Sequence, residues 1–302
     1  MLYEETLGVR GKFRLASSIN AMRRTTANPQ SEEEMAELHF SHEVEGGAVE
    51  VLVRQEKPDE DLLLNIFGET ADSTSLFWIK ERITRMLSLN VDGGEFYEIV
   101  NTDPHLRMAA AICPNLRPVM YATPYEGIMT SILRKGLDMK QSVQLIRNLC
   151  EVAGIVPAGR PSAPPSFPGK FTLLALPDKL LEVVGLPEEK IRVAKNFSAH
   201  LVGDPDPLEY LETVFDSERA IKTLTSLPGI NTMTGMHLLQ YAYGHPDMVL
   251  DGPRLRQAIK RFYNLPEMPD SITVKRLSEP FLRWRSWWTF LLITANETSV
   301  IV

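Results

Sequence analysis

The sequence predicts an α+β protein in which a small antiparallel β domain, residues 1–75, precedes a larger all-helical domain, residues 76–302. Two observations support this division. Apolar side chains alternate with polar ones before about residue 73, which is typical of strands, and recur with a helical period after it. A chain of 302 residues is also long enough for two modest domains with cores of their own.

The β domain is predicted from two strands and the turns that precede them. Val49, Val51 and Val53 alternate with residues of the opposite face after the turn Gly46-Gly47. A second apolar run, residues 62–67, follows the turn at residues 57–59. Residues 17–24 favour a short helix between strands. We therefore expect an antiparallel sheet with a helix packed against it.

Helices are expected from residue 73 onwards. Thr123 and Pro124 are typical of a helix start, and Asp138 can cap the helix that follows. Five prolines in residues 156–168 predict an extended loop. The other helices of this domain are expected at residues 78–87, 92–99, 177–184, 187–201 and 206–215.

Composition predicts a cytoplasmic protein without a cofactor. Apolar residues make up 44% and charged residues 24%, as in ordinary soluble proteins. The chain starts without a signal peptide and has no apolar run that could span a bilayer, so no membrane contact is expected. Cys113 and Cys150 are expected to be buried thiols and are too few to hold an iron–sulfur cluster. His39 and His42, three apart on a strand, do not project together as a metal pair.

The charge distribution is uneven along the chain. The net charge of −7 argues against a nucleic-acid-binding protein. Residues 253–285, however, contain eight basic against three acidic residues, a net charge of +5. This segment is either a solvated surface or a basic face that contacts phosphates, and charge alone leaves both open.

The most informative motif is the segment LPGINTMTG at residues 227–235. Helical patterns precede it at residues 217–224 and follow it at 233–243. A tight hairpin of this kind exposes backbone amides at the start of the second helix, where they can bind a DNA phosphate. The alternative is an ordinary helical hairpin without a binding role, and the motif on its own favours this alternative.

Asp251 stands out downstream of this hairpin. It ends an apolar segment and precedes a basic helix, residues 253–262. A carboxylate at the end of a buried apolar run is costly to desolvate. It is therefore expected either to cap a helix or to have a function. Asp251 can cap the helix that begins at Pro253, and this role is compatible with a catalytic one.

The hairpin, its spacing to Asp251 and the helix after it resemble the helix–hairpin–helix DNA glycosylases, most closely the 3-methyladenine DNA glycosylase II (AlkA-like) type. The resemblance extends over nearly the whole chain. PNLRP and PYE, residues 114–118 and 124–126, are similar to the family's GLRP…PFE. Residues 167–187 resemble its FP…L…LG segment and residues 284–286 its WRS. The N-terminal strands match its small β domain.

The resemblance implies a monofunctional DNA glycosylase that removes damaged, in particular alkylated, bases from double-stranded DNA in base excision repair. Asp251 would stabilise the positive charge on the sugar as the N-glycosidic bond breaks, and help to bring in water. Met233 stands where members with lyase activity have a lysine, and residues 227–251 contain none. We therefore expect no lyase activity. We also expect a monomer that is nucleoid-associated in a bacterium or nuclear in a eukaryote.

The resemblance also implies the remaining site residues. Leu137 would be the wedge that fills the gap left by a flipped base. A monovalent cation can bind at the carbonyls of Thr225, Leu227 and Ile230. The expected contacts to the DNA backbone are Gly229, Ile230, Asn231, Thr232 and Arg254. The expected base pocket consists of Tyr125, Met233, His237 and Trp284.

Four positions depart from the family pattern. Asn231 replaces the second hairpin glycine and is expected to adopt its left-handed conformation. Met233 and His237 replace aromatic residues, and so does Ile293 late in the last helix, which weakens the case for cationic alkylpurines. Other aromatic residues could form pocket walls, although core packing is the commoner role: Tyr125, Phe281, Trp284, Trp287 and Trp288.

Two alternatives stay open. The altered pocket and the overall acidity favour a non-catalytic or structure-selective DNA-binding protein on the same fold, while the retained Asp251 opposes it. A helical scaffold that binds proteins is the other alternative, and would make the basic segment incidental.

Overall fold

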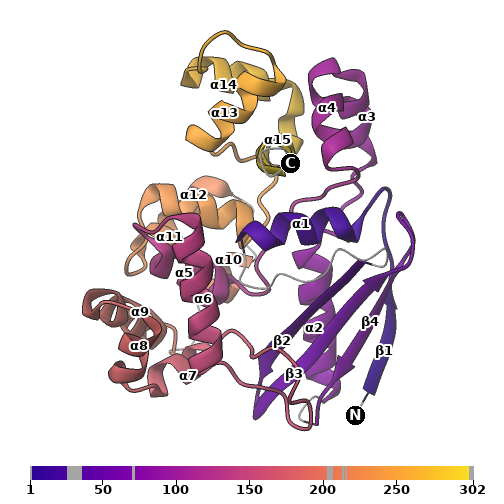
Figure 1. The fold of residues 1–302 in the computed structure, drawn as a ribbon. Helices are drawn as coiled ribbons and strands as arrows, with labels where there is room; N and C mark the ends of the chain where they lie inside the picture. The colour runs from indigo at the N-terminus through magenta and orange to yellow at the C-terminus, as the bar shows by residue number, and fades with distance from the viewer. Residues whose placement is uncertain are drawn as a thin grey trace.

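The four N-terminal strands form one antiparallel sheet in the computed structural model (Figure 1), in the order β1-β4-β3-β2. The strands are β1 (Leu2–Leu7), β2 (Ala36–Val44), β3 (Gly47–Gln55) and β4 (Leu62–Phe67). The structure describes residues 2–25, 36–69, 72–202, 207–212, 214 and 216–298. The sheet precedes a set of helices, so the predicted α+β class is confirmed.

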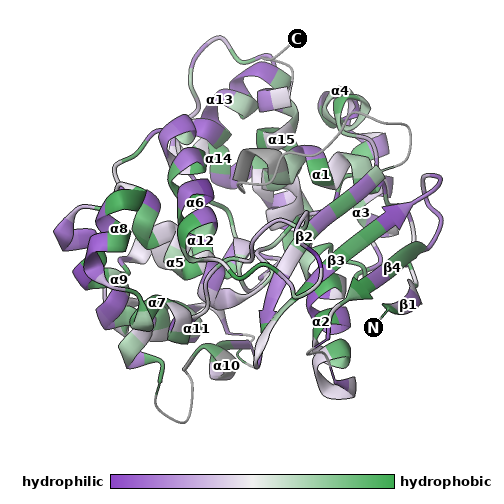
Figure 2. Ribbon diagram, turned by 60° about the horizontal axis from the view of Figure 1, so that its bottom comes forward, coloured by the Kyte–Doolittle hydropathy of each residue, from purple (hydrophilic) through white to green (hydrophobic). Residues whose placement is uncertain are grey.

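One face of the sheet is apolar because the alternation in β3 puts Val49, Val51 and Val53 on the same side, all fully buried. They pack with the helices α1 (Leu15–Thr25) and α2 (Ser73–Met86) in one hydrophobic cluster. Most of the hydrophobic residues of the sheet lie on β3 and β4, while β2 is mixed (Figure 2). The predicted strands and the short helix between them are therefore confirmed.

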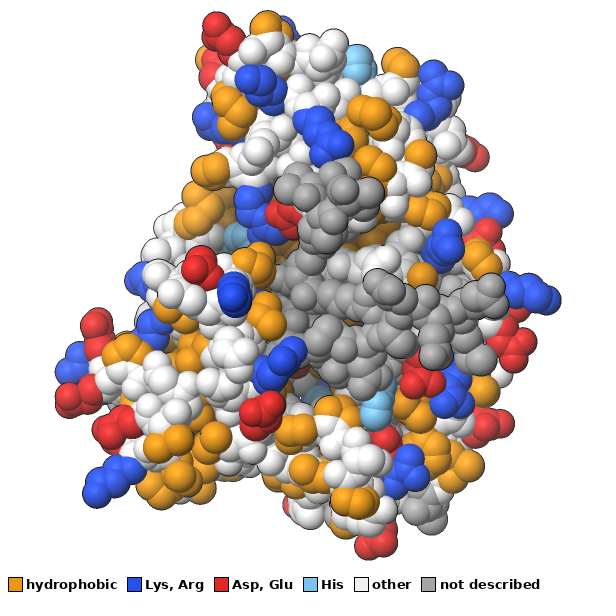
Figure 3. Space-filling model, in the orientation of Figure 1, with side chains coloured by type: hydrophobic (Ala, Val, Ile, Leu, Met, Phe, Trp, Pro, Cys, Tyr) orange, Lys and Arg blue, Asp and Glu red, His pale blue; other side chains and the backbone are white. Residues whose placement is uncertain are grey.

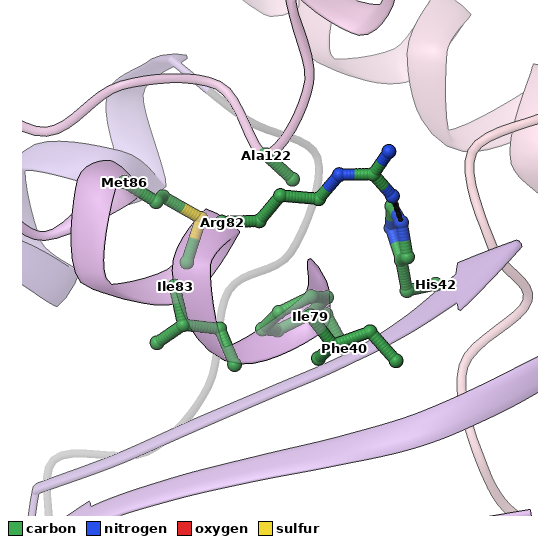
Figure 4. Close-up of a pocket in the computed structure, with 7 residues that line it drawn as sticks. All are labelled: Phe40, His42, Ile79, Arg82, Ile83, Met86 and Ala122. Carbon is green, nitrogen blue, oxygen red and sulfur yellow. Dashed lines mark hydrogen bonds between the residues drawn. The ribbon is translucent and has the colours of Figure 1, made fainter. Parts of the chain in front are cut away.

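The two histidines of β2 have different partners. His42 points toward α2, where Arg82 donates a hydrogen bond to its ring (Figure 4). Burial and the Arg82 cation lower the pKa of His42 to about 3, so the ring is a neutral acceptor. His39 bonds Glu50 on the other face of the sheet. The two rings cannot share a metal ion, as expected from their spacing.

The helices after the sheet begin close to the predicted positions. Asp138 caps its helix in a full capping box with Gln141, and residues 156–168 contain no helix. The helices are α3 (Gly94–Thr102), α4 (Pro104–Ile112), α5 (Pro124–Arg134), α6 (Met139–Ala153), α7 (Lys170–Ala175), α8 (Asp178–Val184), α9 (Glu188–His200), α10 (Pro207–Glu212), α11 (Ser217–Ser226), α12 (Thr232–Tyr241), α13 (Pro253–Phe262), α14 (Ser271–Ser278), the 3₁₀ helix η1 (Glu279–Trp284) and α15 (Arg285–Thr298).

The buried side chains form two clusters that do not follow the chain order. The first joins the sheet and α1–α4 to α13 and α15, and the second lies within α5–α12. The secondary structure therefore changes from strand to helix between Phe67 and Ser73, while the sheet shares its core with the C-terminal helices. The domain division at residue 75 stays a prediction. The chain passes from one cluster to the other at residues 119–128 and returns at residues 248–255.

Buried charged groups tie distant segments together. Arg117, within the PNLRP motif, is fully buried and donates to the carbonyls of Arg10, Lys12, Ser88 and Val91. Glu50 is 3% exposed and is paired with Arg160 of the proline-rich loop. The motif and the loop thus anchor the helices to the N-terminal sheet.

Candidate functional site

Asp251 lies between the two clusters, after Leu250 and before α13. Its carboxylate accepts two hydrogen bonds from Arg256, Nε to Oδ1 at 2.7 Å and Nη2 to Oδ2 at 2.8 Å. Arg256 also donates to the hydroxyl of Ser271 at 2.7 Å. The hydrogen bonds from Arg256 hold the pKa of Asp251 below its ordinary value, against a smaller opposing effect of desolvation. The half-buried carboxylate is ionised at neutral pH.

The prediction that Asp251 caps α13 is wrong. Gly252 occupies the N-cap position and no side chain caps this helix. The carboxylate bonds Arg256 instead, because a guanidinium offers two parallel donors and makes a stronger bond than a single backbone amide. The Asp251 side chain therefore bonds a side chain one turn into α13, and not the backbone amides at the start of that helix.

The segment before Asp251 is held by the WRS motif. The Ser286 hydroxyl donates to the carbonyl of His245 at 2.6 Å and accepts from the amide of Met248 at 3.2 Å. The Ser286 amide donates to the carbonyl of Pro246 at 2.9 Å. Gln240 of α12 donates to the Ser286 carbonyl at 3.2 Å. The buried Ser286 therefore fixes the path by which the chain reaches Asp251.

The predicted hairpin connects α11 to α12. Gly229 has a φ of +83°, the left-handed conformation that favours glycine. An added β-carbon there would lie 2.9 Å from Cγ1 of Val193 in α9, and 3.6 Å from Cγ1 of Ile132 in α5. The turn thus packs closely against both helices.

Asn231 has a different role from the predicted left-handed one, and that prediction is wrong. Its φ is −99°, and it is the N-cap of α12, accepting from the amide of Thr234 at 2.8 Å. The amides of Thr232 and Met233 belong to the first turn and have no carbonyl within the helix to bond. Asn231 and Thr232 are exposed. The start of α12 can therefore bind an anion through backbone groups.

His237 and Tyr241 form a wall on α12. Their rings are stacked with centroids 4.9 Å apart. The His237 ring keeps access to solvent, but protein on its other sides desolvates it and, with the Arg254 cation, lowers its pKa to about 4. Arg254 itself donates from Nε to Glu297 of α15 at 2.6 Å. His237 is thus a neutral group at the surface of α12, beside an exposed ion pair.

The other predicted pocket residues lie elsewhere. Met233 is 57% exposed at the start of α12. Trp284 is 5% exposed and packs against Phe96 and Trp287 in the first cluster. Tyr125 stacks on Phe197, and its hydroxyl lies 2.8 Å from that of Ser198. Trp284 is therefore a core residue, and Tyr125 is partly buried against the second cluster. Phe281, Trp287, Trp288 and Ile293 are buried in the first cluster.

Leu137 lies in the short loop between α5 and α6. Gly136 before it has a φ of +80°, and Asp138 after it starts the capping box. The Leu137 side chain is partly buried against the second cluster. Lys190 of α9 donates to the carbonyl of Leu133 at 2.6 Å and so holds the end of α5. The loop is short and fixed at both ends.

The basic segment is partly neutralised by acids from other elements. Arg254 pairs with Glu297, Arg256 with Asp251, and Arg283 with Glu95. Within the described part of the chain, Lys275 and Arg276 are exposed and make no ion pair. In the view of Figure 3, Lys and Arg side chains are scattered among acidic ones. That residues 253–285 form a face that binds phosphates stays a prediction.

No sequence family model matches the chain, and no curated protein matches it in sequence. Solved structures do. The 3-methyladenine DNA glycosylase from Archaeoglobus fulgidus matches with a TM-score of 0.81 at 18% identity, over 99% of this chain and 100% of that one. The chain has the fold of a DNA glycosylase.

Two further glycosylase folds extend this match. The 8-oxoguanine glycosylase/lyase of Clostridium acetobutylicum, in complex with double-stranded DNA, gives a TM-score of 0.66 at 14% identity, over 99% of this chain and 98% of that one. The 3-methyladenine DNA glycosylase Mag1 of Schizosaccharomyces pombe, bound to abasic DNA, gives 0.53 at 21% identity, over 67% and 95%. The glycosylase fold thus covers the sheet and the helices alike.

The structure adds residues to this glycosylase fold that sequence patterns did not reveal. Arg256 could have been found as a basic residue one turn into the helix after Asp251. Nothing in the sequence links Glu297 to Arg254, 43 positions away, or Ser286 to the segment before Asp251. In the described part of the chain no helix is long and apolar enough to cross a membrane, and no cluster of potential metal ligands occurs.

Proposed function

We propose that the protein is a monofunctional DNA glycosylase that hydrolyses the N-glycosidic bond of damaged bases, alkylated bases included, in double-stranded DNA. One arrangement carries this proposal: an ionised, half-buried carboxylate, Asp251, follows a hairpin whose exposed amides can hold a phosphate. The DNA-bound glycosylases with this fold support DNA as the partner.

In the proposed reaction the base leaves first, and positive charge develops on the sugar. The Asp251 carboxylate stabilises this charge and orients the attacking water. A fixed charge in a site with little water contributes about 3 kcal/mol or more to such a step. Met233 has no amine that could form a Schiff base with the sugar, so strand cleavage by that route is not expected.

The hairpin carbonyls fit the proposed monovalent cation. Thr225 lies in the last turn of α11, where carbonyls have no partner within the helix. Among the described residues, the Leu227 carbonyl accepts one long bond, from the amide of Ile230 at 3.3 Å. Oxygen donors suit a hard monovalent ion. Such an ion would stiffen the hairpin and add positive charge near the phosphate; it would take no part in breaking the bond.

The test is a panel of duplexes that each contain one damaged base. After incubation with the protein, heating in alkali cleaves the strand at any abasic site. We expect strand breaks only after the alkali step. A non-catalytic DNA-binding protein is the second candidate, and the ion pair that engages Asp251 favours it. Salt-dependent binding without abasic sites would support that candidate and overturn the enzyme proposal.

Arg256 is expected to set the lower pH limit of excision. It lowers the pKa of Asp251, so the carboxylate stays ionised, and active, to lower pH. Arg256→Met removes the bond, and the pKa of Asp251 rises toward its ordinary value. The pH below which the single-turnover rate falls should therefore move upward. Arg276→Met, which changes an exposed arginine of α14 that is not bonded to Asp251, is the control. Identical pH profiles for the two variants would show that Arg256 does not control the ionisation of Asp251.

Leu137→Ala is expected to slow excision from duplex DNA. A wedge offsets the few kcal/mol that unstacking a base costs, so its loss lets the flipped base return to the stack. Excision of the same base from single-stranded DNA should change little, because there is no gap to fill. The measurement compares single-turnover excision rates on duplex and on single-stranded DNA. Equal losses on both would show that Leu137 acts through folding.

A further inference from the structure

A partly buried charged cluster lies along α5. Glu126 and Arg134 are eight residues apart, a little over two turns, and so share one face of the helix. Burial raises the pKa of Glu126 to about 7, although the cations Arg134 and Arg85 oppose this. Tyr121 lies just before α5, and the charges of Arg134 and Glu126 both affect its pKa, which burial raises. The cluster combines a carboxyl, a phenol and two guanidinium groups.

Arg134 is the unusual member of this cluster. Among the described residues, its Nε and Nη2 atoms are buried and have no hydrogen-bond partner. The other buried arginines are well satisfied: Arg117 donates to four backbone carbonyls, and Arg85 to those of Tyr121, Ala122 and Ala242. A buried cation with unpaired donors destabilises a fold. A group held in this state is a candidate for binding something outside the chain.

The cluster adjoins the wall of α12 described above. The Tyr121 amide donates to the carbonyl of Tyr241 at 2.9 Å, and Tyr241 stacks on His237. Gly127 allows this approach, since a β-carbon there would lie 2.9 Å from the Tyr121 ring and 3.0 Å from Cβ of Ala242. Arg254, three residues after Asp251, acts electrostatically on both rings of that wall. Tyr121 therefore links the cluster to the wall that His237 and Tyr241 form on α12.

We propose that Arg134 and Glu126 read the edge of the extruded base and select neutral bases that carry a lactam, a carbonyl beside an N–H. The carbonyl accepts from the Arg134 guanidinium, and the N–H donates to the Glu126 carboxyl. Arg134 as a residue is partly exposed, while its Nε and Nη2 atoms are enclosed, so these donors reach the base once the guanidinium turns outward. This inference rests on the proposed glycosylase function and names its preferred substrate class.

The positive charge of this region favours neutral bases over cationic ones. With Glu126 ionised, the cluster of Arg85, Arg134 and Glu126 carries a net charge of +1, and protonation of Glu126 raises it further. His237 is neutral and sits beside Arg254. A cationic alkylpurine would meet like charge here, in surroundings where interactions are poorly screened. Aromatic walls, which attract cations, are replaced by Met233 and His237.

The test uses matched duplexes with hypoxanthine, a neutral lactam; unsubstituted purine, which has neither carbonyl nor N–H; and 7-methylguanine, a cationic lactam. Binding is measured in the Asp251→Asn variant, so that no base is lost and the readout does not depend on catalysis. We expect hypoxanthine to bind about 10- to 100-fold more tightly than either other base, the range of one or two hydrogen bonds to a charged group. Arg134→Met and Glu126→Met should each remove most of this preference, because Met neither donates to the carbonyl nor accepts from the N–H.

Stability and a control separate recognition from folding. Arg134→Met should melt at or above the temperature of the parent, because it removes an unsatisfied buried charge. Arg107→Met, on the exposed side of α4, should alter neither preference nor melting. No preference in the parent, or an equal loss of affinity for all three duplexes in Arg134→Met, overturns the inference. Preference without excision by the unmodified protein overturns only the proposed enzyme activity.

Discussion

Asp251→Asn should reduce base excision by about 10³-fold or more while DNA binding stays intact or tightens. The change keeps the size of the side chain and removes the charge that stabilises the sugar cation, an effect worth about 4 kcal/mol in comparable sites. It also removes a negative charge near the DNA phosphates, which favours binding. Single-turnover excision and binding to the same lesion duplex are the two measurements.

The matched control for this variant is Asp247→Asn. Asp247 lies on the same connecting segment, is exposed and accepts a hydrogen bond from Ser217. It should excise at nearly the rate of the unmodified protein. Folding of Asp251→Asn should persist, since Arg256 is exposed enough for water to replace the lost bond. Excision retained within about tenfold would place the catalytic role on another residue.

The fold could be predicted because each local pattern agrees with the tertiary structure. The alternation of valines in β3, the proline-rich loop and the capping box at Asp138 all depend on neighbours within a few residues. The tight turn between two helices likewise favours a glycine, and Gly229 has the left-handed conformation there. Such features are local, and their chemistry is visible in the sequence.

The candidate site was harder to predict because its side chains are placed by contacts between distant segments. Asp251 bonds Arg256 and not the start of its own helix, and Asn231 caps α12 in place of a left-handed turn. Trp284 was a plausible pocket wall until its packing against Phe96 placed it in the core. The direction of a side chain at a helix end depends on competing partners, which a linear pattern cannot rank.

Gly229→Val is expected to weaken binding to damaged and undamaged duplex alike. The φ of +83° is unfavourable for a β-branched residue, and the new β-carbon would lie 2.9 Å from Cγ1 of Val193. The turn must move, and the amides at the start of α12 move with it. Loss of one or two hydrogen bonds to a phosphate should lower affinity about 10- to 100-fold.

Gly185→Val separates this effect from general strain. Gly185, after α8, has a φ of +102°, and an added β-carbon there meets nothing within 4 Å. Both variants should melt a few degrees below the unmodified protein, because each forces a side chain into the left-handed region. Only Gly229→Val should lose DNA affinity. Equal affinities for the two would reduce the hairpin to a structural turn.

The salt dependence of binding then identifies what the hairpin contributes. Backbone amides bind a phosphate without adding a cationic side chain, so Gly229→Val should shift the plot of log affinity against log salt downward with little change in slope. Arg254→Met should instead reduce the slope by about 1, as expected for one lost ionic contact. Its ion pair with Glu297 is exposed, and breaking it for DNA costs about 1 kcal/mol or less. A change of slope in Gly229→Val as large as that in Arg254→Met would mean that the hairpin acts by positioning cationic side chains, and its amides would lose their assigned role.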